Sequence, residues 1–337
     1  MPELSRTATA TELAVPEAPV VIPFHTYDGS GETVHPDFAA PVSPWRRQLY
    51  YLAITPDPSG NEAFENPSLY ASTDGVSWSG APGAPHPIVR PRAGHLSDPD
   101  LVHASKRGQL FLYYREASDS DRIYMTRSSD GAKWHPPEPM LTAALNSALS
   151  PAVVRRAADD WWMWSVDAGT GCMGLRTQVE VRRSSDGVTW SVPRAVSLDG
   201  VGGTFPWHLD VQWIESRGEF WALFPVKAPG TCATTALFVA TSRDGLTWET
   251  LPAPVLTAGV IPALRDIVYR STFHFDPRTD EMTIWASGAR LDPYGLRWST
   301  VALRRSRQAF FRAARAVRRG TSVPAAPLGV MDRVTPP

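Results

Sequence analysis

The chain has 337 residues, of which 43% are hydrophobic, and its formal net charge is −1. This composition is ordinary for a globular protein, and the near-zero charge excludes a general attraction to nucleic acid or to membrane surfaces. No apolar run reaches the ~18–20 residues that a membrane-spanning helix needs.

The first 19 residues are polar and rich in Thr, Ala, Glu and Pro. They lack the basic start and apolar core of a signal peptide, so the sequence predicts a disordered leader over residues 1–19. Residues 20–24 (Val-Val-Ile-Pro-Phe) form a short strand candidate. We expect this segment to add an outer strand to the last repeat and so to close the ring of repeats.

The heptad Ser-x-Asp-Gly-x-x-Trp occurs four times, at residues 72–78, 128–134, 184–190 and 242–248. Its aspartates are 56, 56 and 58 residues apart, and an even period of this length is typical of a repeat architecture. Asp-Gly between two β-rich segments predicts a hairpin turn, in which Gly takes the positive-φ position. The heptads therefore mark the same turn in successive repeats and have a structural role.

Each repeat contains two strand candidates, a long polar loop, a third strand candidate, the Asp-Gly turn and a fourth strand. A fifth unit begins near residue 269 and lacks the heptad, as terminal repeats often do. The sequence thus predicts an all-β, five-bladed β-propeller over residues 20–306, with four-stranded antiparallel blades.

The segment 307–337 is predicted as a short C-terminal helix followed by a tail. Residues 306–319 are rich in Arg and have apolar residues at helical spacing. Such a helix would lie on the propeller with a solvated Arg face, or it would contact an anionic surface.

In a propeller, the starts of first strands and the ends of second strands share one face around the channel, and the Asp-Gly turns lie on the other face. Aligning the repeats places many charged residues at this channel mouth. The strand-1 starts are His35, Asp98, Ser150, His208 and Arg270; two residues further on are Asp37, Asp100, Ala152, Asp210 and Thr272; strand 2 and strand 3 add Thr55, Arg115, Glu116, Asp167, Lys227, Glu65 and Asp121. Burying such groups is costly without partners, so they indicate either a functional site or inter-blade ion pairs.

The heptads resemble the Asp-boxes of sialidases, and the segment Asp98-Pro99-Asp100 in a five-bladed frame resembles glycoside hydrolase families 43, 32 and 117. The resemblance implies hydrolysis of furanosides such as arabinans, with Asp98 orienting the catalytic acid and tuning its pKa. The sequence departs from these families where they place a base and an acid, since it has His35-Pro36-Asp37 and Ser150-Pro151 there.

Glycoside hydrolysis needs two carboxyl groups on either side of the anomeric carbon. We assign catalysis to Asp98, with Glu116 as the acid and Asp210 as the base, and expect all three in one pocket. The predicted substrate-binding residues are His35, Asp37, Glu65, Arg115, Asp167, His208 and Arg270. No cofactor is required by this reaction and no metal ligand set is assigned, although a channel-bound cation such as calcium is compatible with these side chains.

The sequence therefore predicts a glycoside hydrolase that cleaves an arabinan-like, furanose-containing polysaccharide and has neither a nucleic acid nor a membrane partner. The alternatives are a non-catalytic glycan-binding propeller and a structural component of a phage or secreted assembly. Cys172 and Cys232 lie in matching loops of adjacent repeats, which makes a disulfide geometrically plausible. A disulfide favours a secreted protein, although no signal peptide is visible.

Overall fold

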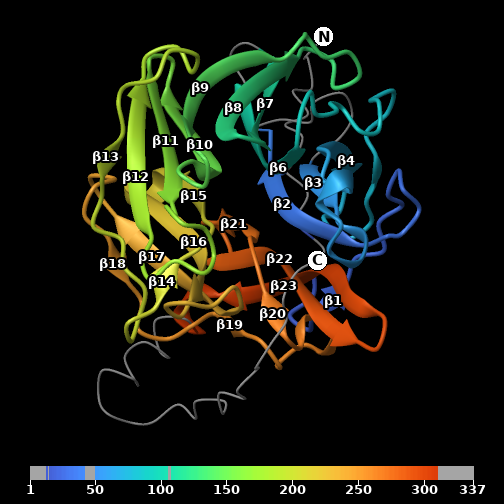
Figure 1. Cartoon of the computed structure of the whole chain (residues 1–337), viewed down its shortest axis with the longest axis vertical. Helices are drawn as coiled ribbons and strands as arrows, with labels where there is room; N and C mark the ends of the chain where they lie inside the picture. The colour runs from blue at the N-terminus through green and yellow to red at the C-terminus, as the bar shows by residue number, and fades with distance from the viewer. Residues whose placement is uncertain (1–12, 14, 42–49, 105–107, 310–337) are drawn as a thin grey trace, which may run out of the picture.

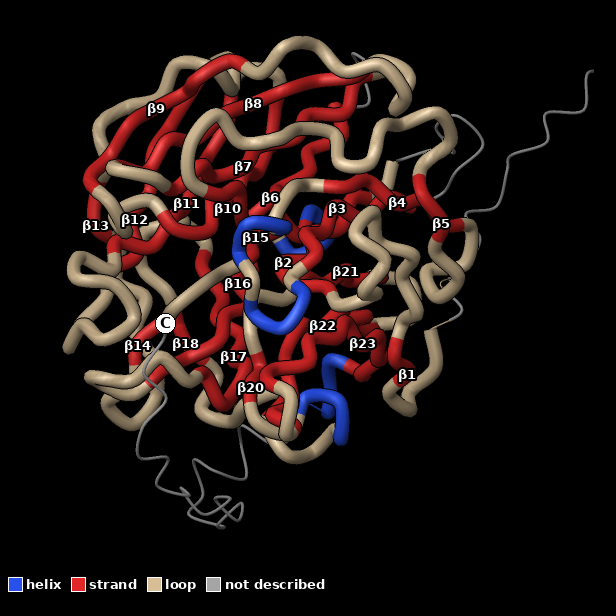
Figure 2. The backbone as a smooth tube through the Cα atoms, turned by 45° about the vertical axis from the view of Figure 1, so that its right-hand side comes forward, coloured by secondary structure: helices blue, strands red, loops and turns tan. Residues whose placement is uncertain are grey.

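The computed structural model describes residues 13, 15–41, 50–104 and 108–309. In this part of the chain five antiparallel sheets are arranged around a common centre, which their innermost strands β2, β6, β10, β15 and β21 face (Figure 1). Strands dominate, and the helical segments are short connections between them (Figure 2). The predicted five-bladed, all-β fold is confirmed.

The strands follow the predicted order within each repeat. Blade one contains β2 (Thr33–Ala39), β3 (Tyr50–Pro56), β4 (Ser68–Ser72) and β5 (Ser79–Gly80). Blade two contains β6 (His95–Ala104), β7 (Gln109–Ala117), β8 (Ser120–Ser128) and β9 (Glu138–Ala144). Blade three contains β10 (Leu149–Ala157), β11 (Asp160–Asp167), β12 (Gln178–Ser184) and β13 (Arg194–Ala195).

The first strand of each remaining blade is split in two. Blade four contains β14 (Phe205–Pro206), β15 (Asp210–Ile214), β16 (Glu219–Lys227), β17 (Thr234–Ser242), β18 (Glu249–Thr250) and β19 (Leu256–Thr257). Blade five contains β20 (Ile267–Val268), β21 (Thr272–Asp276), β22 (Glu281–Asp292) and β23 (Gly295–Ser306).

The ring is closed by the N-terminal strand β1 (Val20–Val21), which pairs antiparallel with β23. Val20 lies opposite Ala302 and Val21 opposite Val301, so the first strand among the described residues is the outermost strand of the last blade. This is the closure predicted from the sequence.

In all four heptads the aspartate Oδ1 accepts the same two backbone hydrogen bonds. In the first, Asp74 Oδ1 accepts hydrogen bonds from the backbone N–H groups of Val76 and Ser77 at 2.8 and 2.7 Å. Gly75 has a φ of 78°, which glycine adopts without strain, and its carbonyl accepts a bond from Trp78 Nε1 at 3.0 Å. Each carboxylate therefore holds a turn, as the repeat pattern predicts.

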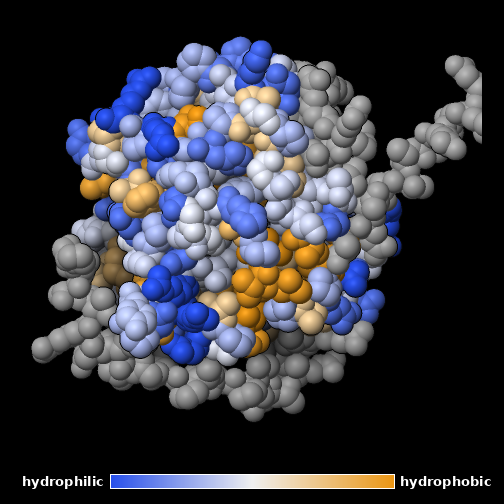
Figure 3. Space-filling model, turned by 90° about the vertical axis from the view of Figure 1, so that its right-hand side faces the viewer, coloured by the Kyte–Doolittle hydropathy of each residue, from blue (hydrophilic) through white to orange (hydrophobic). Residues whose placement is uncertain are grey.

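The core lies between adjacent blades. The largest cluster joins blades three and four and includes Trp162, Trp164, Trp207, Phe220 and Trp248. On the outside, the face drawn in Figure 3 is mostly hydrophilic; its largest apolar area lies below and to the right of the centre, and smaller ones lie on the left. No helix in the described part of the chain is long and apolar enough to cross a membrane.

The predicted N-terminal boundary changes. Val15 is 1% exposed and belongs to a core cluster, and the carbonyl of Pro16 accepts a hydrogen bond from the backbone N–H of Arg304. Contact with the last blade therefore begins before residue 20, inside the segment predicted as a disordered leader. Residues 307–309 are helical, and the rest of the predicted C-terminal helix lies outside the described residues.

Candidate active site

A β-bulge interrupts the first strand of blades one, two and three at the same place. The register shifts lie between Val34 and Asp37, between Ser97 and Asp100, and between Leu149 and Ala152. The central residues are His35, Asp98 and Ser150, with φ values of 55°, 51° and 51°, and each precedes a proline. Left-handed backbone costs about 1–2 kcal/mol for such residues, and strain of this kind is concentrated at functional sites.

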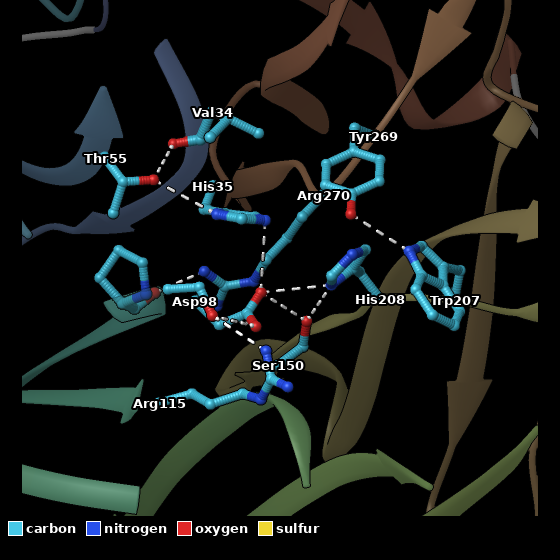
Figure 4. A network of polar contacts seen from close by, with 12 residues as sticks. Val34, His35, Thr55, Asp98, Arg115, Ser150, Trp207, His208, Tyr269 and Arg270 are labelled. Atoms are coloured by element: carbon cyan, nitrogen blue, oxygen red, sulfur yellow. Dashed lines mark hydrogen bonds and ion pairs between the residues drawn. The ribbon is translucent and has the colours of Figure 1, made fainter. Parts of the chain in front are cut away.

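The bulges turn these three side chains toward one another, and His208 from the break between β14 and β15 joins them (Figure 4). Asp98 Oδ1 lies 3.6 Å from His35 Nε2 and 3.2 Å from His208 Nδ1. The Ser150 hydroxyl donates to Asp98 Oδ1 at 3.0 Å and lies 2.5 Å from His208 Nδ1. All four residues are at most 3% exposed, so they form a compact buried polar cluster.

The hydrogen bonds of His35 indicate its tautomer. The hydroxyl of Thr55 donates its proton to the carbonyl of Val34 at 3.2 Å, so it accepts a bond from His35 Nδ1 at 3.3 Å. The proton of this imidazole is therefore on Nδ1, and the lone pair of Nε2 faces Asp98. Nε2 has no hydrogen-bond partner among the described residues. A lone pair facing a carboxylate favours a cation between them.

His35, Asp98 and His208 each offer one ligand atom, and these atoms lie within 4.8 Å of one another. Two imidazoles and one carboxylate form a donor set that suits a catalytic divalent metal such as Zn²⁺ or Fe²⁺. The oriented Nδ1–H of His35 is also typical of metal-ligating histidines. The residues present thus fit a metal ion, which the sequence analysis did not assign.

Electrostatics agree with this donor set. Burial lowers the pKa of His35 well below its ordinary value and also lowers the pKa of His208. Burial alone would raise the pKa of Asp98, but the two neighbouring imidazoles hold it well below its ordinary value. Near pH 7 the cluster therefore contains neutral imidazoles and a carboxylate, which are the protonation states that bind metal ions.

Arg115 positions Asp98 through Ser97. The Arg115 guanidinium pairs with Asp121 at 2.7 Å and donates to the Ser97 hydroxyl at 3.3 Å. That hydroxyl in turn donates to Asp98 Oδ2 at 3.1 Å. Both oxygens of Asp98 are therefore held by serine hydroxyls, and Arg115 supports one of these serines.

Tyr269 forms one wall of the cluster. Its ring centroid lies 4.4 Å from that of His208 and 5.4 Å from that of His35. Its hydroxyl accepts a hydrogen bond from Trp207 Nε1 at 3.2 Å (Figure 4). Because Trp can only donate, the phenolic proton of Tyr269 remains available to a bound ligand.

Glu65 is the carboxyl group on the other side of His35, with Oε2 at 4.0 Å from Nδ1. It is 5% exposed, and its pKa lies well above its ordinary value because of burial and the nearby charges of Asp57 and Glu62. A raised pKa suits a carboxyl group that exchanges protons near neutral pH.

Thr55→Val is expected to weaken metal binding about 10–100-fold, the effect typical of removing a partner that orients a ligating histidine. Valine keeps the size of Thr55 and its buried position in β3 but cannot accept the Nδ1–H bond of His35. Metal titration monitored by calorimetry would measure the change. Thr55→Ser, which keeps the hydroxyl, should restore affinity, and equal weakening by both variants would contradict the assigned role.

Asp57→Asn is expected to stabilise the protein above pH 7. Burial and the nearby charges of Glu62 and Glu32 raise the pKa of Asp57 to about 7, whereas the unfolded value is near 4. Between these values the folded protein holds a proton that the unfolded chain releases, so wild-type stability falls as pH rises from about 4 to about 7. The variant should lose this pH dependence, which amounts to up to about 4 kcal/mol in the free energy of unfolding. Urea denaturation at pH 4.5 and at pH 8 would measure it. Parallel pH profiles would contradict the assignment.

A second layer, two residues further along each first strand, connects neighbouring blades. Asp37 accepts a hydrogen bond from the backbone N–H of Leu101, Asp100 from that of Val153 and Asp210 from that of Phe273. Thr272 closes the series by accepting from the N–H of Phe38. Ala152, the blade-three counterpart, has no side-chain acceptor for the N–H of Val211 in blade four. That N–H donates to Asp210 of its own blade. These side chains tie blades together.

Arg270 supplies the positive charge of this layer. It is fully buried, with Nη2 at 3.5 Å from Asp37 and 3.9 Å from Asp100, and it donates to the carbonyl of Pro99. The pKa values of Asp37, Asp100 and Asp210 are all raised, primarily by burial. The sequence left open whether these charged side chains form a functional site or ion pairs between blades. Pairing between blades accounts for the positions of Asp37, Asp210 and Arg270, which the sequence predicts as catalytic or substrate-binding residues.

The structure separates the three residues predicted as catalytic. Asp98 lies in the His35–Asp98–His208 cluster. Asp210 lies in the inter-blade layer, where it accepts a hydrogen bond from the Thr272 hydroxyl at 2.9 Å. Glu116 accepts from the backbone N–H of Arg92 at 3.1 Å and lies 3.9 Å from Arg122. Successive side chains of a strand point to opposite faces, so Glu116 points away from the cluster that Arg115 supports. This geometry does not support the predicted catalytic set.

Asp167 accepts hydrogen bonds from the Ser147 hydroxyl and from the backbone N–H of Gly169, so it caps a loop. Sequence reasoning also missed functional candidates. The sequence places Ser150 at the channel mouth without suggesting a role for its hydroxyl, and it places Tyr269 at the start of the fifth unit. The repeat alignment could have identified Ser150, because it occupies the same position in blade three as His35 in blade one and Asp98 in blade two.

The chain is similar to a curated A type blood N-acetyl-α-D-galactosamine deacetylase of Flavonifractor plautii, with 27% identity over 347 aligned residues. The alignment covers 86% of this chain but 45% of the relative, so the chain spans less than half of that protein. The crystal structure of an N-acetylgalactosamine deacetylase from F. plautii in complex with blood group B trisaccharide superposes with a TM-score of 0.80 at 25% identity, covering 89% of this chain and 97% of the other.

More distant structures share the fold. A thermostable family-43 glycoside hydrolase has a TM-score of 0.55 at 12% identity, over 82% of this chain and 91% of the other. The α-L-arabinanase of Penicillium chrysogenum has a TM-score of 0.54 at 12% identity, over 87% and 98%. No protein-family model matches the sequence. The comparisons support a carbohydrate-active propeller and do not single out furanoside cleavage.

Proposed function

We propose that the chain removes the acetyl group of an N-acetylated amino sugar, with a divalent cation held by His35, Asp98 and His208. The observation that carries the proposal is the lone pair of His35 Nε2, which faces Asp98 in a buried cluster of two imidazoles and one carboxylate. The similarity to the deacetylase of F. plautii supports it, since that relative shares the propeller over most of this chain.

Deacetylation adds water to the acetyl carbonyl carbon, breaks the C–N bond and leaves acetate and a free amine. A bound divalent cation would supply a Lewis acid that polarises the carbonyl group and activates water. In this proposal Glu65, whose Oε2 lies 4.0 Å from His35 Nδ1, would take a proton from the attacking water and give one to the departing amine nitrogen. The Tyr269 hydroxyl is oriented by Trp207 to donate to a carbonyl or sugar oxygen.

Furanoside hydrolysis is the competing proposal, because Glu65 and Asp98 are two buried carboxyl groups on either side of His35. The reactions give different products. Purified protein would be incubated with an N-acetylgalactosaminide and, separately, with arabinan, with assays for acetate and for reducing ends. We expect acetate release that a chelator abolishes and added Zn²⁺ or Mn²⁺ restores. Reducing ends from arabinan without acetate release would contradict deacetylation.

We also infer that the protein works in an oxidising, extracellular compartment. Cys172 and Cys232 form a disulfide with their Cα atoms 4.7 Å apart, and such bonds persist outside reducing compartments. Glycans that carry N-acetylated sugars are accessible there. Fractionation of the native cells, with immunodetection of the protein in medium and cytosol, tests the location.

A further inference from the structure

A cavity of about 260 Å³ lies on blade two, away from the His35–Asp98–His208 cluster. Its floor is formed by β7 and β8, where Tyr114 pairs with Tyr124 and Glu116 with Arg122. Directly paired residues point to the same face of a sheet, so these side chains face away from Arg115. The segment that joins blades one and two contributes Ile88, Val89, Arg90 and Arg92 to its lining.

We propose that this cavity binds an acidic sugar unit, one that bears a carboxylate or a sulfate group. Two of the lining side chains are arginines, and Glu116 is the single acid among them. Glu116 is already held by the backbone N–H of Arg92 and by the nearby Arg122. Arg90 and Arg92 are exposed residues of the lining, and the guanidinium carbon of Arg90 lies 5.5 Å from the ring centroid of Tyr27. Both arginines can pair with an anionic substituent.

The rest of the lining suits a sugar ring. Tyr114 and Tyr124 stack with their centroids 5.7 Å apart and an interplanar angle of 15°, and both line the cavity. Phenolic hydroxyl groups donate to and accept from sugar hydroxyls. Ile88, Val89 and Pro137 form an apolar wall for the C–H face of the ring. Apolar surface with a few polar groups is the usual composition of a small-ligand site.

This inference does not depend on deacetylation, because the cavity and the His35–Asp98–His208 cluster use different side chains on opposite faces of the blade-two sheet. The ligand would be an acidic unit of the substrate glycan or of a separate acidic polysaccharide. Either source presents the same group, and activity assays with acidic and neutral versions of one N-acetylated glycan would distinguish them.

The test is a calorimetric titration of the full chain with a galacturonic acid trisaccharide, a sulfated galactose disaccharide and a neutral galactose disaccharide. We expect the acidic sugars to bind at least about tenfold more tightly than the neutral sugar, and less tightly as salt is raised. Arg90→Gln with Arg92→Gln should remove this preference. Arg194→Gln with Arg243→Gln, two exposed arginines elsewhere, is the matched control and should keep it.

Asp98→Asn separates this proposal from the proposed function, since it removes the cluster's carboxylate and should leave acidic-sugar binding unchanged. Equal binding of acidic and neutral sugars would overturn the proposal. So would unchanged binding in the Arg90/Arg92 variant, or loss of binding in Asp98→Asn. Circular dichroism confirms folding of each variant, and because both arginines are exposed we expect their replacement to leave the fold intact.

Discussion

Asp98→Asn is expected to reduce both deacetylation and metal binding by at least about 100-fold. Loss of a residue that only supports a ligand costs up to about 100-fold, and loss of a ligand should cost at least as much. The substitution removes the only carboxylate of the His35–Asp98–His208 set while keeping the shape of the side chain. Asn tolerates the left-handed backbone that Asp98 adopts at a φ of 51°, and its carbonyl oxygen can still accept from Ser150. The loss would therefore report on charge rather than on misfolding.

The measurements are acetate release and bound metal per protein, with thermal unfolding to confirm the fold. Asp186→Asn is a matched control, because Asp186 holds an Asp-Gly turn by accepting from Val188 and Thr189. That turn lies on the opposite face of the propeller, so the control should lower stability modestly and leave catalysis unchanged. Full activity and metal content in Asp98→Asn would contradict the proposed function.

The fold could be predicted because its signal is local and repeated. Each Asp-Gly turn is determined by residues within one heptad, and the period marks four blades, to which the strand pattern after residue 269 adds a fifth. Aligning the repeats also identified the five side chains at the start of the first strands, including His35, Asp98 and His208. Those three form the metal-binding candidate set in the structure.

The roles of these residues could not be predicted, because role depends on which way a side chain points. Arg115 and Glu116 are neighbours in sequence, yet they lie on opposite faces of one sheet and belong to different sites. Asp98 and Asp100 are two residues apart, but a β-bulge lies between them. Asp98 therefore joins the His35–Asp98–His208 cluster, whereas Asp100 joins the inter-blade layer. A list of the carboxylates at the channel mouth shows neither the direction of each side chain nor the position of the bulge.

Replacing Cys172 and Cys232 with serine is expected to lower the free energy of unfolding by about 4 kcal/mol, from a cross-link that closes a loop of 60 residues. The bond joins the β11–β12 loop of blade three to the β16–β17 loop of blade four. Among the described residues, the inter-blade layer supplies a side-chain bond at the other four seams, but Ala152 supplies none at this one. The disulfide therefore crosses the seam that lacks that bond.

Two measurements test this. The denatured, unreduced protein should show no reactive thiol, and two should appear after reduction. Guanidinium denaturation with and without reductant should then reproduce the loss seen in the serine variant. Asp100→Asn provides the comparison, since it weakens a bond at the seam between blades two and three without touching the disulfide. If reduction leaves stability unchanged, the Trp-rich core between blades three and four holds that seam by itself, and the disulfide has no stabilising role.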